Sequence, residues 1–303
     1  MHEILNKKHY RRAFYVIFAV LVILILILRY SVLPLFDQNL QAAIVPTIAS
    51  FADKILTSLV VTVAVGSFIF WLTPDIMSRS QMEVIEPRSI SDLLEQAMKR
   101  TDVWWLKGGC GRYFRSMTLP EIAKAARGSS STREINVLIL DPRNEKLCAA
   151  YATYRGSLRS AKGEKSWTVS RVRNELYATL ICIQIATYEE PLLRINLGLI
   201  NVFSSFRFDL SSEYVIVTKE DKYAPAMRCD KETFFYKSYL DEMVIAHKQS
   251  SKLPNVEKVP SRNELDQNLT KELLVQMGLG TTIEDSDITE VLSLVKKLEN
   301  PYA

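Results

Sequence analysis

Two long apolar segments near the N-terminus constrain the fold of this chain more than any other feature. Residues 13–28 contain no charged residue and continue past Arg29, and residues 55–72 are also free of charge. A bilayer core of roughly 30 Å is crossed by about 20 apolar residues in a helix. The sequence therefore predicts a transmembrane hairpin over residues 13–76, with its two helices over about 13–33 and 55–73.

Basic residues set the expected orientation of this hairpin. Four Lys and Arg side chains lie within residues 7–12, whereas the stretch 37–54 between the apolar segments has a single basic residue, Lys54. Lys and Arg collect on the cytoplasmic side of a membrane. We therefore expect residues 1–12 and everything after the hairpin to be cytoplasmic. The first segment is too long for a cleaved signal and is not followed by a small-residue cleavage site.

One side of the second apolar segment carries small side chains. Ser58, Thr62 and Gly66 are spaced four residues apart, so they lie on the same face of a helix. Small residues allow close helix contacts in lipid. This face packs either against the first helix of the same chain or against another copy of the chain, and the sequence leaves both arrangements open.

The rest of the chain has the pattern of an α/β domain. We expect a linker over 77–88, a ligand-sensing domain over 89–250 and a helical tail over 251–303. Apolar strands are expected at 103–106, 135–140, 193–200 and 214–217, and helices lie between them, with Thr118 as the N-cap of one. Strands that alternate with helices favour a largely parallel sheet. The tail is expected to form two short helices near 262–277 and 283–298.

Composition excludes several functions for this domain. The chain has 38 Lys and Arg against 34 Asp and Glu, a net charge of +4, which is too weak for a surface that binds DNA or RNA polymers. Four widely spaced cysteines match neither a zinc motif nor a disulfide framework. His247 is the only histidine after the hairpin, so no Ser-His-Asp or Cys-His unit is expected. We therefore expect no metal, no cofactor and no enzymatic activity.

Polar residues follow the predicted strands at the sheet edge where open α/β sheets bind ligands. A glycine loop follows the first strand, and its N–H groups and arginines are suited to phosphate. The candidate ligand-binding residues are Lys107, Gly108, Gly109, Gly111, Arg112, Arg115, Asp141, Arg143, Asn144, Arg155, Arg207, Asp209 and Thr218. The alternative is that the loop is a tight turn and that these charges pair with one another.

The strand order and the turn at 204–209 resemble a half domain of the phospholipase D type. In that family a His-x-Lys motif and a following Asp act near the ends of the later strands. The corresponding stretch here, 206–209 running into 214–218, has no histidine. The resemblance therefore implies a binding cleft that has lost its phosphodiesterase centre.

The layout of the whole chain resembles the two-transmembrane effectors of bacterial anti-phage defence, in systems of the CBASS or Panoptes type. That resemblance implies a cyclic di- or oligonucleotide as the ligand, a homo-oligomer as the assembly and the bacterial inner membrane as the location. It also implies that the hairpins assemble to disrupt the lipid bilayer.

Two other functions stay open. One is a membrane-anchored enzyme acting on nucleotides or phospholipids, with Asp141 and Asp209 holding a metal. The other is a scaffold without a ligand, in which the charges at the strand ends only pair with each other.

Overall fold

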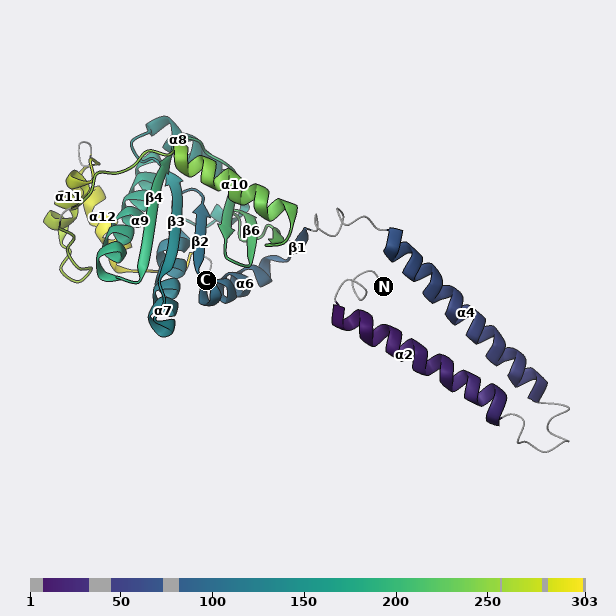
Figure 1. Ribbon diagram of the computed structural model, residues 1–303. Helices are drawn as coiled ribbons and strands as arrows, with labels where there is room; N and C mark the ends of the chain where they lie inside the picture. The colour runs from purple at the N-terminus through teal and green to yellow at the C-terminus, as the bar shows by residue number, and fades with distance from the viewer. Residues whose placement is uncertain (1–7, 33–44, 73–81, 257, 280–282, 302–303) are drawn as a thin grey trace. The chain divides into compact units, whose positions relative to one another are not determined.

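The structure, a computed structural model, describes residues 8–32, 45–72, 82–256, 258–279 and 283–301 (Figure 1). Contacts divide the chain into two compact units, Met1–Ser78 and Arg79–Ala303. The first unit contains the apolar segments and the second contains the α/β domain.

The first unit has two long helices. Helix α2 (Lys8–Ile27) continues as a short π-helix, η1 (Leu28–Val32), and the second helix is α4 (Val45–Leu72). The windows Tyr15–Val32 and Pro46–Phe68 are long and apolar enough to cross a membrane, and only 0% and 11% of their residues are buried. A core helix of a soluble protein would be mostly buried instead. The prediction of two apolar helices is confirmed at this level.

Helix α4 begins earlier than expected. It starts at Val45 rather than near residue 55, so Asp53 and Lys54 are helical and do not lie in a loop. The reason is local, because Pro46 suits a first helical turn, where its missing N–H has no partner to lose. The expected loop residues 37–44, Lys7 and the first part of the linker lie outside the described residues.

The two helices of the hairpin contact each other through side chains. The hydroxyl groups of Tyr15 and Ser67 are 2.9 Å apart, which brings the neighbour of Gly66 against α2. Thr62 donates a 2.7 Å hydrogen bond to the carbonyl of Ser58 in the turn before it. Ser58 and Thr62 are exposed in the single chain and Gly66 is half-buried.

The second unit is built on a seven-stranded sheet with the order β1-β7-β6-β5-β2-β3-β4. Strands β2, β3 and β4 are parallel, whereas β5, β6, β7 and β1 follow one another in antiparallel pairs beyond β2. The strands are β1 (Glu83–Ile85), β2 (Val103–Lys107), β3 (Arg133–Leu140), β4 (Leu193–Ile200), β5 (Phe206–Leu210), β6 (Tyr214–Lys219) and β7 (Ala226–Asp230).

The expectation of a largely parallel sheet is wrong, because the sheet is mixed. Residues 206–209, expected as a turn, belong to strand β5, which pairs with β2 and with β6. Strands β5 and β6 form a hairpin whose turn is closed by a 2.9 Å bond from the Ser211 N–H to the Tyr214 carbonyl. Antiparallel neighbours need no crossover helix, so the helix-strand alternation does not extend beyond β4.

Helices cover both faces of the sheet (Figure 1). The described helices of this unit are α6 (Pro87–Arg100), α7 (Leu119–Ser129), α8 (Glu145–Ser157), α9 (Val169–Glu189), α10 (Phe234–Gln249), α11 (Gln267–Gln276) and α12 (Asp285–Lys296), with a short π-helix, η3 (Phe114–Thr118), and a short 3-10 helix, η4 (Arg159–Ala161). Helix α10 packs on one face, where Phe208, Tyr236 and Met243 form a small apolar cluster.

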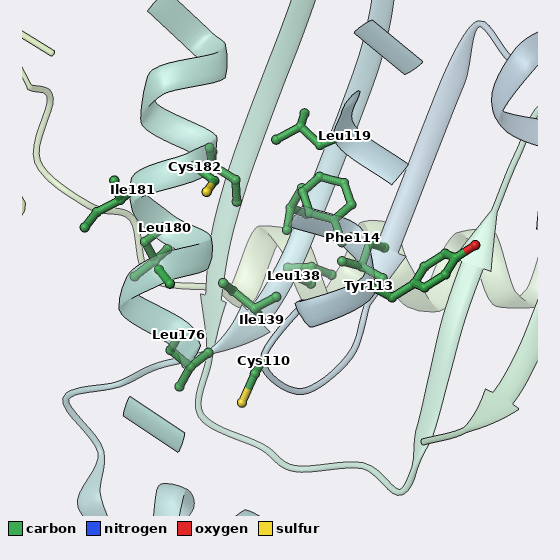
Figure 2. Packing of buried hydrophobic residues seen from close by; sticks show 14 of the residues in the cluster. Cys110, Tyr113, Phe114, Leu119, Leu138, Ile139, Leu176, Leu180, Ile181 and Cys182 are labelled. Carbon is green, nitrogen blue, oxygen red and sulfur yellow. The ribbon is translucent and has the colours of Figure 1, made fainter. Parts of the chain in front are cut away.

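The main core lies between the sheet and the remaining helices (Figure 2). Its fully buried side chains include Phe114, Ile139, Leu176 and Leu180. Strand β2 shows how the two faces are divided. Trp104 joins the main core, and its neighbour Trp105 packs with the α10 cluster, because successive side chains of a strand point to opposite faces.

A threonine caps the start of α10, whereas the threonine expected to cap α7 does not. Thr233 caps α10 by accepting the Tyr236 N–H, as an N-cap hydroxyl does. Thr118, the expected N-cap of α7, is itself helical at φ −65° and ψ −51° and makes no cap bond. The physical reason is that η3 runs directly into α7, so the Leu119 N–H already bonds to the Phe114 carbonyl.

Both ends of the second unit form regular secondary structure, where the sequence predicted a linker and a separate helical tail. Strand β1 and the first residues of α6 fall within the expected linker 77–88. Helices α11 and α12 pack against α9, and Leu273, Leu274 and Val291 are buried in the main core. The C-terminal helices therefore belong to the fold of this unit.

Candidate functional site

The candidate residues that follow the strands gather at one edge of the sheet. In the β2–β5 pair Lys107 lies opposite Phe208, and in the β5–β6 pair Phe206 lies opposite Lys219. The carboxyl ends of β2 and β6 therefore lie beside the start of β5. The glycine loop after β2 and the turn after β6 meet at this edge, and their side chains divide between the two faces of the sheet.

Lys107 lies on the α10 face, away from the candidate arginines. Its Nζ is 2.6 Å from Oε1 of Glu242 on α10 and 5.8 Å from the centre of the Phe208 ring. Leu106, the preceding residue, points into the main core. The alternation of side chains along β2 thus assigns Lys107 to packing with α10.

Asp141, Arg143 and Asn144, at the carboxyl end of β3, interact locally. Arg143 binds both carboxylate oxygens of Asp141, at 2.9 and 2.7 Å. Burial raises the pKa of Asp141, but the hydrogen bonds from Arg143 and Ser251 outweigh it and lower the pKa below its ordinary value. Asn144 caps α8 by accepting the Leu147 N–H at 3.1 Å.

The glycine loop is a tight turn whose N–H groups bond to the protein. Gly108 donates to the Leu138 carbonyl and Gly109 donates to Glu220, both at 3.0 Å. Tyr151 also donates its hydroxyl to Glu220. Gly111 has φ +70°, a conformation that favours glycine. Where the sequence predicted a ligand phosphate, the N–H of Gly109 binds a carboxylate of the protein.

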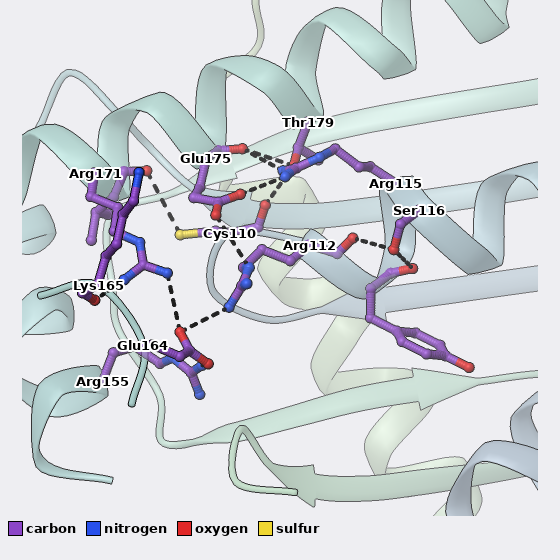
Figure 3. Close-up of polar contacts among 12 residues, drawn as sticks. Cys110, Arg112, Arg115, Ser116, Arg155, Glu164, Lys165, Arg171, Glu175 and Thr179 are labelled. Carbon is purple, nitrogen blue, oxygen red and sulfur yellow. Dashed lines mark hydrogen bonds and ion pairs between the residues drawn. The ribbon is translucent and has the colours of Figure 1, made fainter. Parts of the chain in front are cut away.

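Four arginines converge behind this loop and are called the arginine cluster here: Arg112, Arg115, Arg155 and Arg171 (Figure 3). Glu175 binds two of them, with Oε2 at 2.5 Å from Arg115 Nη2 and Oε1 at 3.2 Å from Arg112 Nε. Its side chain is only 4% exposed, so Glu175 is a buried structural partner.

Glu164 binds three members of the same cluster from a surface loop. Its carboxylate is 3.1 Å from Arg171, 3.5 Å from Arg112 and 3.9 Å from Arg155. The same three guanidinium groups lie 4.2, 5.4 and 4.8 Å from the Trp167 ring centre, in that order. Arginine stacks on aromatic faces in this way, so the cluster is held together by stacking as well as by charge.

A cavity of about 710 Å³ lies between α6 and strands β5 and β6, and is called the α6 cavity. Of the predicted site residues it brings together Arg207, Asp209 and Thr218. Arg207 binds Asp209 through Nε and Nη2 at 2.7 and 2.8 Å and stacks 5.1 Å from the Tyr113 ring centre. Burial raises the pKa of Asp209, and the neighbouring Arg207 opposes that rise.

Sequence reasoning missed most of the other residues that line the α6 cavity. Tyr113 comes from the stretch after the glycine loop and Ser91 from α6. Lys219 is the last residue of β6, and Lys222 and Tyr223 belong to the turn after it. That turn was the available signal, because basic and aromatic residues directly follow a buried strand at the edge already identified. Asn300, near the end of the chain, also lines the cavity.

A second cavity, of about 470 Å³, adjoins the first and is called the basic cavity. The two share Lys222, Tyr223 and Asn300. Seven cationic residues line the basic cavity, Arg112, Arg115, Lys162, Lys165, Arg171, Lys222 and Lys297, against three acidic ones, Glu164, Glu175 and Glu299. The lining therefore carries four more positive than negative charges (7 − 3).

A metal site is not formed by the described residues, which include no group of three or more His, Cys, Asp or Glu side chains suited to an ion. Asp141 and Asp209, the two carboxylates considered for a metal, are each held by the arginine two residues away in sequence. In each pair the positive charge beside the carboxylate comes from the arginine.

Comparisons with known proteins identify no family for this chain. No protein-family model matches the sequence, and no curated protein matches it either. Among solved structures it is similar to TrmBL2, an archaeal chromatin protein whose structure is described as showing a novel mode of DNA binding. The identity is 10%, the match covers 68% of each chain and the TM-score is 0.33. A likeness this weak carries no argument about fold or function.

Proposed function

We propose that the protein is a membrane-tethered sensor whose second unit binds a small, phosphate-bearing nucleotide, cyclic in form, in the α6 cavity. The proposal depends chiefly on one observation, the combination of aromatic rings, hydroxyl groups and cations around that cavity. Its volume of about 710 Å³ falls in the range of roughly 300–1,000 Å³ that is usual for small-molecule sites.

The chemistry of the lining suits each part of a nucleotide. Tyr223, which is 55% exposed, offers a ring on which a base can stack. Ser91 and Thr218 offer hydroxyl groups for the sugar, and Lys219 and Lys222 offer charge for the phosphates. A cyclic dinucleotide needs all three kinds of contact within one cavity.

The hairpin supplies the output in this proposal. Two apolar helices with little internal burial are suited to lipid and to other copies of the chain. Ligand binding controls their association in a homo-oligomer if the ligand has unequal affinity for two assembly states. Disruption of the bacterial inner membrane during anti-phage defence is the output that the layout of the chain favours.

One observation favours the scaffold as a second candidate function. Most of the charges first considered for the ligand are paired within the protein: Asp141 with Arg143, Asp209 with Arg207, and the arginine cluster with Glu164 and Glu175. A scaffold would keep these pairs and bind no ligand.

A binding experiment separates these functions. The full chain in nanodiscs of neutral lipid is titrated calorimetrically with a panel of cyclic di- and trinucleotides, and the ligand is then recovered by chromatography. The sensor binds one of them and returns it intact. Hydrolysed ligand would favour the enzyme, and absence of binding would favour the scaffold.

A matched pair of variants tests whether the ligand stacks on Tyr223, which lines both cavities. Tyr223→Ala removes a ring that lines the α6 cavity and is 55% exposed, and Tyr188→Ala removes one that is 68% exposed on α9. Base stacking on an aromatic side chain is worth roughly 1–3 kcal/mol, or about 5- to 150-fold in affinity. Tyr223→Ala should weaken binding by that factor, and Tyr188→Ala should leave it unchanged.

A further inference from the structure

We propose that the basic cavity is a second ligand site, which takes a phosphate-bearing polyanion, and that Glu164 is the internal carboxylate that this ligand displaces. The inference is independent of nucleotide binding in the α6 cavity. It depends mainly on other side chains, those of the arginine cluster (Figure 3) and of Lys162 and Lys165, although the two cavities share Lys222, Tyr223 and Asn300.

The positive charge that lines the basic cavity is only partly compensated by the protein. The lining of the basic cavity has an excess of four positive charges. Like charges that share a hollow of about 470 Å³ repel one another, and low-dielectric walls strengthen that repulsion. A polyanion bound in the cavity removes the repulsion, whereas a neutral ligand or a single carboxylate leaves most of it in place.

The two carboxylates that pair with the arginine cluster, those of Glu164 and Glu175, differ in exposure and in the length of their contacts. Glu175 is 4% exposed and makes contacts of 2.5 and 3.2 Å with its arginines. Glu164 is 26% exposed, and two of its three contacts are as long as 3.5 and 3.9 Å. Glu175 is therefore fixed within the fold, whereas Glu164 is a loosely held anion that solvent reaches.

The arginines around Glu164 are arranged in a way that suits a phosphate better than a carboxylate. Three guanidinium groups, from Arg112, Arg155 and Arg171, point at one carboxylate. A carboxylate has two oxygens, whereas a terminal phosphate has three and a larger charge. A phosphate in the same position can therefore offer each guanidinium its own oxygen, in the paired geometry that arginine prefers.

Glu164 also lies in a loop from which its side chain can move away from the arginines. It belongs to the loop between η4 and α9, next to Gly163 at φ +95°. A Cβ added at Gly163 would meet no atom within 4 Å, so the turn is open to solvent. Displacing the Glu164 side chain therefore does not require the main core to change.

The test uses the full chain in nanodiscs of neutral lipid, with inorganic tripolyphosphate as the probe and calorimetry as the readout. Glu164→Gln removes the internal competitor, and we expect it to bind tripolyphosphate about tenfold more tightly than the wild type does, a factor reduced by the partial exposure of the site. The matched control is Glu145→Gln, which makes the same charge change at a glutamate that pairs with Arg173 and whose side chain is 74% exposed. It should leave the affinity unchanged.

A second variant tests the cations without touching the buried arginines. Lys162 and Lys165 line the cavity and are exposed, so Lys162→Gln with Lys165→Gln should preserve the fold. We expect this pair to weaken tripolyphosphate binding about tenfold or more. Lys124→Gln, at an exposed position on α7, is its control and should have no effect.

A lipid headgroup offers the same chemistry as a soluble polyphosphate. A parallel arm therefore replaces neutral nanodiscs with discs containing phosphatidylglycerol and measures tripolyphosphate binding again. If tripolyphosphate binds equally well in both kinds of disc, the site takes a soluble polyanion. If phosphatidylglycerol weakens tripolyphosphate binding, and weakens it more in the Glu164→Gln variant, the site takes a lipid headgroup. The proposal is overturned if the wild type binds neither, or if Glu164→Gln binds no more tightly than Glu145→Gln.

Discussion

Replacing Gly109 with alanine tests the packing of the glycine loop against Tyr151 of α8. A Cβ at this position would lie 2.3 Å from the hydroxyl oxygen and the Cζ of Tyr151, which is far inside van der Waals contact. Tyr151 is 2% exposed, so it has no room to move. The clash pushes Tyr151 away from Glu220, which also accepts the Gly109 N–H at 3.0 Å.

The cost follows from two terms. Overpacking a buried site costs about 1–3 kcal/mol, and each hydrogen bond lost to the Glu220 carboxylate adds about 1–2 kcal/mol. We expect Gly109→Ala to lower the free energy of unfolding by roughly 2–5 kcal/mol, a large part of the roughly 5–15 kcal/mol that is usual for a domain.

Denaturant unfolding of the full chain, followed by tryptophan fluorescence, measures this loss. Gly128→Ala on α7 is the control, because a Cβ there meets nothing within 4 Å and alanine favours a helix by up to about 1 kcal/mol. In a Tyr151→Ala background the steric part of the Gly109→Ala cost should disappear. An equal cost in both backgrounds would refute the clash, as would a wild-type unfolding midpoint for Gly109→Ala.

Three further predictions concern reactivity, pH and the membrane. Burial raises the pKa of Cys148 and of Cys229 to about 11 and that of Cys110 well above its ordinary value, so iodoacetamide at about pH 8 should label the four buried cysteines only after denaturation, as mass spectrometry can show. Because the pKa of Asp141 is lowered in the folded protein, its carboxylate stabilises the fold at pH values above its ordinary pKa, and this stabilisation is lost as the pH falls below about 4. The difference in unfolding free energy between wild type and Arg143→Gln should therefore vanish over that pH range in urea titrations. Gly66→Leu adds bulk next to Ser67, which contacts α2, and should abolish dye entry into expressing cells; unchanged dye entry would remove this packing face from the mechanism.

Several parts of the fold were predictable because their residues repeat with a clear period. The apolar positions Val172, Leu176 and Leu180 predict α9, and all three are fully buried. The apolar run of β3 was equally clear. Each depends on neighbours within one or two helical turns or along a single strand, where local physics decides the outcome.

The antiparallel half of the sheet was not predictable in this way. Strand β5 places Arg207 and Asp209 on one face and Phe208 on the other, so its charges look like a turn in the sequence. Strand β7 has the same mixed character, and β1 is only three residues long. Pairing with distant strands, rather than local preference, makes these segments extended.

The candidate site could be predicted as an edge of the sheet but not as a set of contacts. The carboxyl ends of the strands indicate where side chains gather. The partner of Lys107 is Glu242, which is 135 residues away in sequence. The glutamates that pair with Arg112 and Arg115, Glu164 and Glu175, are likewise 52 and 60 residues away in sequence, and no local pattern indicates such pairs.

Coupling between ligand binding and the hairpin is the central claim, and disulfide crosslinking measures it most directly. Thr62 is exposed on α4 in the single chain, so Thr62→Cys places a thiol on the proposed packing face, while the native cysteines are buried. In membranes containing the full chain, we expect the cyclic nucleotide bound by the second unit to change the yield of crosslinked dimer, and we expect Tyr223→Ala to reduce that change. A yield of dimer that is the same with and without bound nucleotide would show that the ligand does not control the hairpin.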